Sequence, residues 1–143
     1  MAPAEIARIL GAEKVLGREI RTDVQLEQCA REGFPVGVLE ELIERAVLSP
    51  GELYQWIIPR RTFAHRQKKR QRLSLDESNR VSRVVRLYAL AVETLGDEEK
   101  AKRWLRRPLR QFGGRAPIEM LETDFGAHQV EVLLGKIGHG LAA

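Results

Sequence analysis

Residues 48–73 read LSPGELYQWIIPRRTFAHRQKKRQRL, and this stretch decides the fold of the chain. It predicts two short helices joined by a tight turn. Ser49 supplies a hydroxyl N-cap and Pro50 a first-turn proline, which together start a helix. Pro59 lacks an amide donor and disfavours helix at the residue before it, so the first helix ends there and a second follows. A short capped helix, a tight turn and a basic second helix form a helix-turn-helix pattern.

The positive charge of the chain is concentrated in the second of these helices. Residues 60–72 contain seven cations and no acid, whereas the whole chain has 24 basic and 20 acidic residues. The rest of the chain therefore holds 17 basic against 20 acidic residues. Positive charge focused in this way is typical of a surface that binds phosphate. A solvated basic helix without a partner is the alternative.

The spacing within the second helix separates an inner face from an outer face. Phe63 is expected to pack inward against Leu53 and Trp56. Because the N-terminal end of a recognition helix faces base edges, we predict that it reads DNA bases, while later cations contact phosphates. The predicted base-reading residues are Arg61, Thr62 and His65, with a helix-start hydroxyl as the alternative role of Thr62, and the predicted phosphate contacts are Arg60, Arg66, Lys68 and Lys69.

Length, composition and cysteine content narrow the class of protein. A chain of 143 residues suits one domain or two small ones. Its one cysteine, Cys29, allows no internal disulfide, which suits a reducing compartment. The N-terminus lacks the apolar core of a signal peptide, and no apolar run approaches the roughly 20 residues of a membrane span. We expect a soluble cytoplasmic protein with no membrane partner.

Helical periodicity also fills the N-terminal third of the chain. Residues 1–17 form either a short helix or a loosely held arm. Residues 18–32 predict a turn and a short helix, with Val24 and Leu26 as apolar anchors and Gly33 as the stop. Pro35 opens a core-facing helix whose inward positions are Val36, Leu39, Leu42, Ile43 and Ala46.

The sequence also predicts helices throughout the C-terminal half of the chain. Ser74 and Glu77 form a capping box that opens the longest helix, which ends near Leu95. Asp97 caps a helix over 98–107, and Pro117 starts a short one. No segment longer than a few residues alternates as a strand does, so the predicted fold class is all-α. A last helix over 124–137, capped by Thr123 or Asp124, has Phe125, Val130, Val132, Leu133, Leu134 and Ile137 as its apolar positions.

The long helix over 75–95 has an apolar face wider than one small partner helix requires. A homodimer would explain this width, and core packing within one chain is the alternative. The residues predicted to lie at a dimer interface are Val81, Val84, Val85, Tyr88 and Val92.

Patterns for catalysis and metal binding are absent from the sequence. His65, His128 and His139 are the only histidines, and none stands at metal-ligand spacing from another His or a Cys. No phosphate-binding glycine loop follows a strand. We expect no metal, no cofactor and no catalytic residues, so the protein is not an enzyme.

Three stretches of the chain match a known family. They are IPRRTFAHRQKKRQRLSLDESNR (58–80), LYALAVETLGDEEKAKRWLRRP (87–108) and GGRAPIEMLETDFGAHQVEVLLGKIGHG (113–140). The last two are the specific ones, because many regulators share a helix-turn-helix. On these stretches, from about residue 33 to residue 140, the chain resembles antitoxins of the Xre/MbcA/ParS group, the partners of RES-domain toxins. In this family a glycine often stands at the position of Arg70, so the basic helix is expected to continue further here.

The resemblance implies the function and the order of the domains. Such antitoxins bind the operator of their own operon as autorepressors. They also neutralise a toxin that resembles ADP-ribosyltransferases and consumes NAD, by blocking its active site. The expected parts are an N-terminal arm with short helices (1–32), a DNA-binding helix-turn-helix region (33–73), a dimerisation helix (74–96) and a toxin-binding domain (97–143).

The C-terminal tail is the predicted blocking element. It holds two glycines and one large apolar side chain, so it gains little by packing on its own domain, and a disordered end is the alternative. Small residues can enter a narrow nucleotide cleft. The predicted toxin-binding residues are Arg115, Gln129 and Lys136 as polar contacts, and Gly138, His139, Gly140, Leu141 and Ala143 in the tail.

Two other functions fit the same pattern. One is a stand-alone helix-turn-helix transcriptional repressor without a toxin partner. The other is a protein-binding inhibitor whose helix-turn-helix no longer reads DNA. A neighbouring gene for a RES-domain protein would argue against the first, and DNA binding with steep salt dependence would argue against the second.

Overall fold

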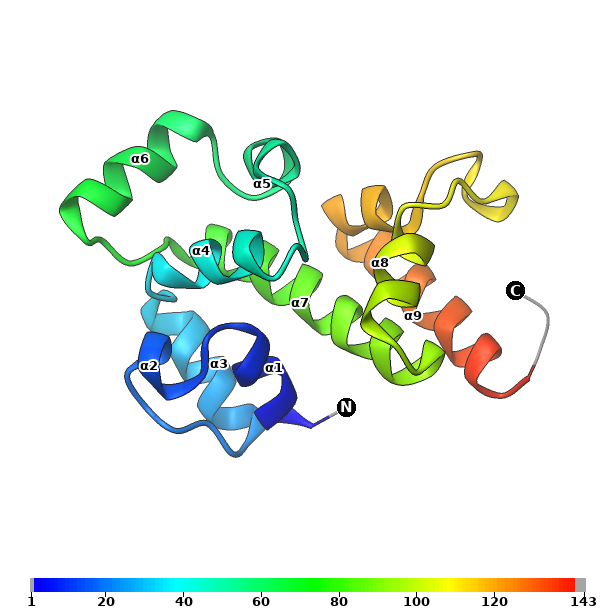
Figure 1. Cartoon of the computed structure of the whole chain (residues 1–143), viewed down its shortest axis with the longest axis horizontal. Helices are drawn as coiled ribbons and strands as arrows, with labels where there is room; N and C mark the ends of the chain where they lie inside the picture. Colours follow the sequence, from blue (N-terminus) through cyan, green and yellow to red (C-terminus); the bar gives the residue numbers. More distant parts are fainter. Residues whose placement is uncertain (1, 141–143) are drawn as a thin grey trace. The chain divides into compact units, whose positions relative to one another are not determined.

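The computed structural model describes residues 2–140, which form helices joined by loops (Figure 1). Within this range there is no strand, and one isolated bridge pairs Pro35 with Arg72. The predicted all-α fold is confirmed. The described chain divides into two compact units, an N-terminal unit (residues 2–82) and a C-terminal unit (residues 83–140).

The N-terminal unit contains six helices and the start of a seventh. Within it, α4 lies between the group α1–α3 and the pair α5–α6 (Figure 1). The sequence left open whether residues 1–17 form a short helix or a loosely held arm, and the described part of this segment, residues 2–17, contains two short helices. The bounds are α1 (Pro3–Ile9), α2 (Ala12–Leu16), α3 (Asp23–Glu32), α4 (Gly37–Glu44), α5 (Pro50–Trp56), α6 (Arg60–Lys69) and α7 (Leu75–Leu95).

Aliphatic side chains form the core of this unit. Burying each of them stabilises the fold by about 1.5–3 kcal/mol. They come from the end of α1, from α4, α5 and α7, and from the loop between α4 and α5, which fixes these helices against one another. The fully buried ones include Leu10, Val38, Leu39, Leu42, Leu48, Leu53 and Val81.

Two predicted inward positions of this unit face the solvent instead. Val24 is 76% exposed, so α3 is anchored by Cys29, which is 1% exposed. Ala46 follows the end of α4 with a φ of 56° and is exposed. Helical periodicity assigned Ala46 to the inner face, but the helix stops at Glu44 and the backbone turns away.

The predicted helix-turn-helix is confirmed in its local detail. The backbone N–H of Ser49 donates to Glu52 Oε1 at 2.8 Å, and the N–H of Glu52 donates to Ser49 Oγ at 3.2 Å, so a capping box opens α5. Phe63 of α6 is 5% exposed, as predicted. Its ring lies 6.4 Å from that of Tyr54, centroid to centroid.

The expectation that α6 continues past Arg70 is wrong. Arg70 has a φ of 53°, in the left-handed region that ends helices. The N–H of Gln71 donates to the carbonyl oxygen of Arg66 at 3.0 Å, which closes the last turn. Arginine therefore occupies a position whose backbone favours glycine.

The C-terminal unit consists of the rest of α7 and four further elements. Asp97 caps α8 by accepting a hydrogen bond from the N–H of Lys100 at 3.2 Å. Of the two candidate caps for α9, Thr123 is the one used, because its Oγ1 accepts from the N–H of Gly126 at 3.0 Å. The bounds are α8 (Glu98–Leu105), the 3-10 helices η1 (Arg110–Phe112) and η2 (Pro117–Glu122), and α9 (Asp124–Gly138).

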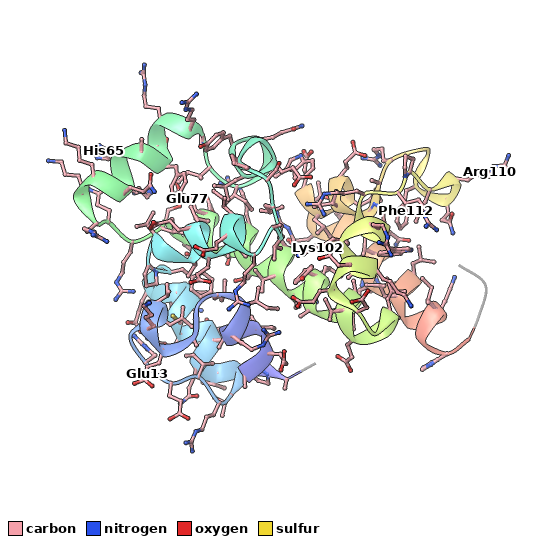
Figure 2. All side chains as sticks on the ribbon, in the orientation of Figure 1. Glu13, His65, Glu77, Lys102, Arg110 and Phe112 are labelled. Carbon is pink, nitrogen blue, oxygen red and sulfur yellow. The ribbon has the colours of Figure 1, made fainter. Side chains whose placement is uncertain are left out.

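The core of the C-terminal unit draws on every one of its elements. Tyr88 is 1% exposed, and its hydroxyl donates to Glu98 Oε1 at 2.9 Å. Phe112 is buried at the end of η1, whereas Arg110 extends from the tip of the same turn (Figure 2). Other buried side chains are Leu87, Ala101, Trp104, Leu105, Ile118, Leu121, Val130, Leu133 and Leu134.

Two apolar positions of the last helix are not part of this core. Phe125 is 87% exposed and Val132 is 39% exposed. The sequence pattern placed both among the apolar positions of the helix. Phe125 lies on the outer side of α9, away from the buried residues Gly126, Ala127 and Val130, so the apolar pattern alone gave it the wrong environment.

Gly126 brings α9 and η2 into direct backbone contact. A Cβ added at Gly126 would overlap the carbonyl oxygen of Met120. Backbone atoms cannot rotate out of the way as a flexible side chain can. Gly135, on the exposed side of the same helix, has open space where a Cβ would be.

We predict that Gly126→Ala lowers the free energy of unfolding by at least about 2 kcal/mol, because η2 must shift away from α9. The matched control is Gly135→Ala, which gains about 1 kcal/mol from helix propensity alone. Urea unfolding followed by circular dichroism measures both. Equal shifts in the same direction would refute the close contact at Gly126.

Candidate functional site

The outward side of α6 is the first candidate site. We name Arg60, Arg61, Lys68 and Lys69 the α6 basic face, since all four side chains are exposed. Within the described part of the chain, none of them forms an ion pair. His65 is also exposed and lies on the outer side of α6 (Figure 2), while Thr62 is half-buried. Four uncompensated cations on one helix can attract and hold phosphates.

Arg66 stands apart from the other predicted phosphate contacts. Its side chain is 21% exposed, and its Nε lies 2.9 Å from Glu77 Oε1. A hydrogen bond from Nη2 to Glu77 Oε2, 3.1 Å long, adds to this ion pair. Arg66 Nη1 also donates to Gln71 Oε1 at 3.3 Å. The guanidinium therefore fixes α6 to the start of α7. Unlike the side chains of the α6 basic face, it is not free to bind a ligand.

Glu77 joins two structural roles at one carboxylate. Its Oε1 accepts from the N–H of Ser74 at 2.8 Å, and its own N–H donates to Ser74 Oγ at 3.1 Å, which confirms the predicted capping box. The residue is 7% exposed and lies on the inner side of α6 (Figure 2). One side chain thus caps α7 and holds the recognition helix.

The groups around Glu77 lower the pKa of its carboxyl group. Burial acts to raise the pKa, but hydrogen bonds from Arg66 and Ser74, with the charge of Arg66, bring it below the ordinary value of a glutamate. The charged form is therefore the one that the folded N-terminal unit favours.

A second basic feature of this unit is a depression of about 340 Å³ beside the start of α4. Three cations line it, Lys14, Arg70 and Arg72, and no acid does. Arg72 Nη1 is held by the carbonyl oxygen of Gly33 at 3.0 Å. The charge run in the sequence signals two of these cations, but only the fold brings Lys14 of α2 to them.

The predicted toxin-binding residues lie in the C-terminal unit. Arg115 and Gln129 are exposed and line one pocket of about 340 Å³. Lys136 is exposed on α9 but does not line it. Gly138 is the last residue of α9. His139 and Gly140 follow and are exposed, whereas Leu141 and Ala143 lie outside the described residues.

Four of the five residues predicted for a dimer interface are buried within the single chain. Val81 and Val85 are 0% exposed, Tyr88 1% and Val84 5%. Only Val92 is half-buried. The alternative reading, core packing within one chain, accounts for the apolar width of α7 at these four positions.

The fold and the site define a class, the all-helical proteins that join a basic helix-turn-helix to a separate helical unit. Residues 25–86 match the model of the antitoxin Xre-like helix-turn-helix domain. Residues 90–140 match that of the antitoxin Xre/MbcA/ParS C-terminal toxin-binding domain.

Curated relatives agree with both matches. The chain is 40% identical to an antitoxin Xre of Pseudomonas putida, over 85% of this chain and 76% of that protein. It is 32% identical to an antitoxin Xre of Photorhabdus laumondii, over 82% and 81%. Another, from Yersinia enterocolitica, is 32% identical over 97% and 94%. The chain belongs to the Xre antitoxin family.

Family membership confirms the predicted class, an antitoxin with a helix-turn-helix domain and a toxin-binding domain. It also confirms that the protein is not an enzyme, since the family is one of inhibitors and not of catalysts. Among the helices described, none is long and apolar enough to cross a membrane. Residues 2–140 bring no three potential ligands together around a metal ion.

We predict that Glu77→Gln lowers the free energy of unfolding by about 2 kcal/mol, because it leaves the Arg66 guanidinium without its counter-charge. The control is Glu27→Gln in the exposed pair of Glu27 with Arg31, which should change stability by less than about 0.5 kcal/mol. Because folding lowers the Glu77 pKa, its contribution is complete above an unfolded pKa of about 4.3 and disappears as the pH falls through the folded pKa.

Denaturant unfolding at pH 7 and at pH 3 measures this effect. The difference between the wild-type protein and Glu77→Gln should be larger at pH 7 than at pH 3, because the contribution is lost progressively below the unfolded pKa. A difference that is independent of pH would contradict a role for the charge.

Proposed function

We propose that this antitoxin binds and inhibits a RES-type toxin that consumes NAD, and that it represses its own operon by binding operator DNA. The observation that carries the proposal is the division of exposed groups between the two units. The α6 basic face lies within the helix-turn-helix match, over 25–86. The exposed groups of α9 lie within the toxin-binding match, over 90–140. Two ligands could then bind one chain at the same time.

For DNA, the arrangement of α6 supports separate roles along the helix. Arg61 in the first turn and His65 one turn later are exposed and suit base edges. Arg60, Lys68 and Lys69 suit phosphates. The pair of Arg66 with Glu77 supports a different role for Arg66, because it sets the orientation of the helix that the other cations use. The Lys14–Arg70–Arg72 depression offers a further phosphate site.

We predict that Lys69→Ala weakens binding to all DNA sequences and reduces the slope of log Kobs against log[salt] by about 1. The matched control is Lys100→Ala, which removes an equally exposed cation from α8 of the other unit and should leave the slope unchanged. Titration of operator DNA at several salt concentrations measures both variants. Equal slopes for Lys69→Ala and the wild-type protein would remove Lys69 from the interface.

For the toxin, the end of α9 supports an obstructing element. The helix ends at Gly138, and the N–H of His139 donates to the carbonyl oxygen of Gly135 at 3.1 Å. The residues that follow are a histidine, a glycine, Leu141 and two alanines, and the imidazole can donate or accept a hydrogen bond. Ordering a chain segment on binding costs about 1 kcal/mol per residue. The helix must therefore provide most of the affinity, and the tail provides inhibition.

We predict that truncation after Ile137 restores NAD consumption by the toxin while a weaker complex still forms. Truncation after Gly140 is the companion variant, because it keeps the described turn and removes only residues 141–143. NAD turnover and complex formation are measured for the same samples. Full inhibition by the shorter protein would exclude the tail from the mechanism.

We further propose a homodimer, since two recognition helices on two half-sites would raise specificity beyond that of one short helix. The burial of Val81, Val84, Val85 and Tyr88 indicates that other surface must mediate it. Sedimentation should give twice the 16.2 kDa mass of the chain. A single 16.2 kDa species at micromolar concentration would contradict the dimer.

A further inference from the structure

Phe125 is the most exposed large apolar side chain among residues 2–140, with 87% of its surface accessible. The others are Val24, Leu75 and Val132, which are smaller or less exposed. An aromatic ring that lies in water adds nothing to the stability of its own domain. Rings of this kind are enriched where proteins contact their partners. The fold therefore gives no reason for a phenylalanine at this position.

The pocket of about 340 Å³ opens beside this ring. Apolar and polar groups both line it, so it can take an apolar group and fix its orientation by hydrogen bonds. Arg115 is exposed and has no side-chain partner in the described range, so its guanidinium is free to bind an acceptor. The lining residues include Arg115, Glu119, Met120, Glu122, Phe125 and Gln129.

The backbone that carries Phe125 is held rigidly. Thr123 caps the helix through the N–H of Gly126 at 3.0 Å, and its carbonyl oxygen accepts from the N–H of Ala127 at 2.9 Å. Gly126 itself is in contact with the backbone of Met120. A ring presented on such a base loses little backbone entropy when it binds.

Arg83 fixes the same turn from α7. Its Nε donates to the carbonyl oxygen of Leu121 at 2.8 Å, and its Nη2 donates to that of Glu122 at 3.1 Å. Its Nη1 lies 2.9 Å from Asp124 Oδ1. The Arg83 side chain is 16% exposed, whereas the Asp124 side chain is 90% exposed, so the Arg83 end of the pair is the buried one. They hold the two residues before Thr123 and the one after it.

An exposed stripe continues from the ring along α9. Gln129 and Val132 stand four and seven positions after Phe125, which places all three on one side of the helix. Gln129 is exposed and Val132 is 39% exposed. A helix face with an aromatic residue, an amide and an aliphatic residue suits a protein surface and not a nucleic acid, which would call for cations.

We propose that Phe125 is the apolar anchor through which the antitoxin holds its toxin, with the pocket beside it receiving a group from the same partner. The occupant is the toxin because the ring, the pocket and the stripe all lie within residues 90–140, the match to the toxin-binding domain. Its surface carries an apolar recess for the ring and an acceptor that faces Arg115. This inference rests on the proposed toxin partner. It assigns the affinity for the toxin to residues of α9.

The test measures binding of the full-length chain to a purified RES-domain toxin, by titration calorimetry. Phe125→Ser is expected to weaken binding at least about 30-fold, the effect of losing an interface hot spot. Phe125→Trp should keep binding within about 3-fold, since it preserves an apolar ring. The matched control, Val24→Ser, removes an apolar side chain that is 76% exposed in the N-terminal unit and should also stay within about 3-fold.

Each outcome separates the inference from the function on which it rests. Loss of binding for Phe125→Ser alone, with unchanged thermal unfolding, supports the anchor. Equal binding of Phe125→Ser and the wild-type chain overturns the anchor and leaves the toxin partner in place. No binding by the wild-type chain overturns the proposed partner itself. A change in the sedimentation mass of the free antitoxin on Phe125→Ser would assign the ring to a second copy of the chain and also overturn the anchor.

Discussion

The ion pair between Arg66 and Glu77 is the constraint on which the DNA-binding part of this protein depends. Glu77 caps α7 through Ser74 and at the same time holds α6 through two contacts with Arg66, of 2.9 and 3.1 Å. The seven cations in and beside the recognition helix repel one another. On its inner side the helix packs through one aromatic ring, that of Phe63. A buried carboxylate that neutralises one of these cations fixes the helix and leaves the others free for a ligand.

Four helix starts of this chain could be predicted from the sequence because each depends on neighbouring residues. Ser49, Ser74, Asp97 and Thr123 accept hydrogen bonds from amides three positions later, and local spacing alone reveals such caps. The direction of an apolar side chain depends on which element packs against it. Periodicity therefore placed Val24 inward although it is 76% exposed.

The candidate sites, too, could be predicted from the sequence only in part. A run of cations is visible in the sequence, but its separation into free residues and one structural arginine requires the position of Glu77. The α6 basic face and the exposed end of α9 belong to different units, each with its own core. Evolution could therefore alter the operator preference through one set of side chains and the partner preference through the other. Family membership indicates the class of each ligand, DNA and a toxin. The exposed residues then decide which DNA sequence and which toxin bind.

The left-handed backbone of Arg70 has a consequence for how the protein balances stability against affinity. Glycine at a φ of 53° would relieve a strain of about 1 kcal/mol. It would also remove one of the three cations around the depression beside α4. Glycine thus suits the backbone at position 70 best, whereas arginine suits an anion best. The chain has arginine there. Selection for thermal stability alone would be expected to replace Arg70 with glycine and to weaken binding as it did so.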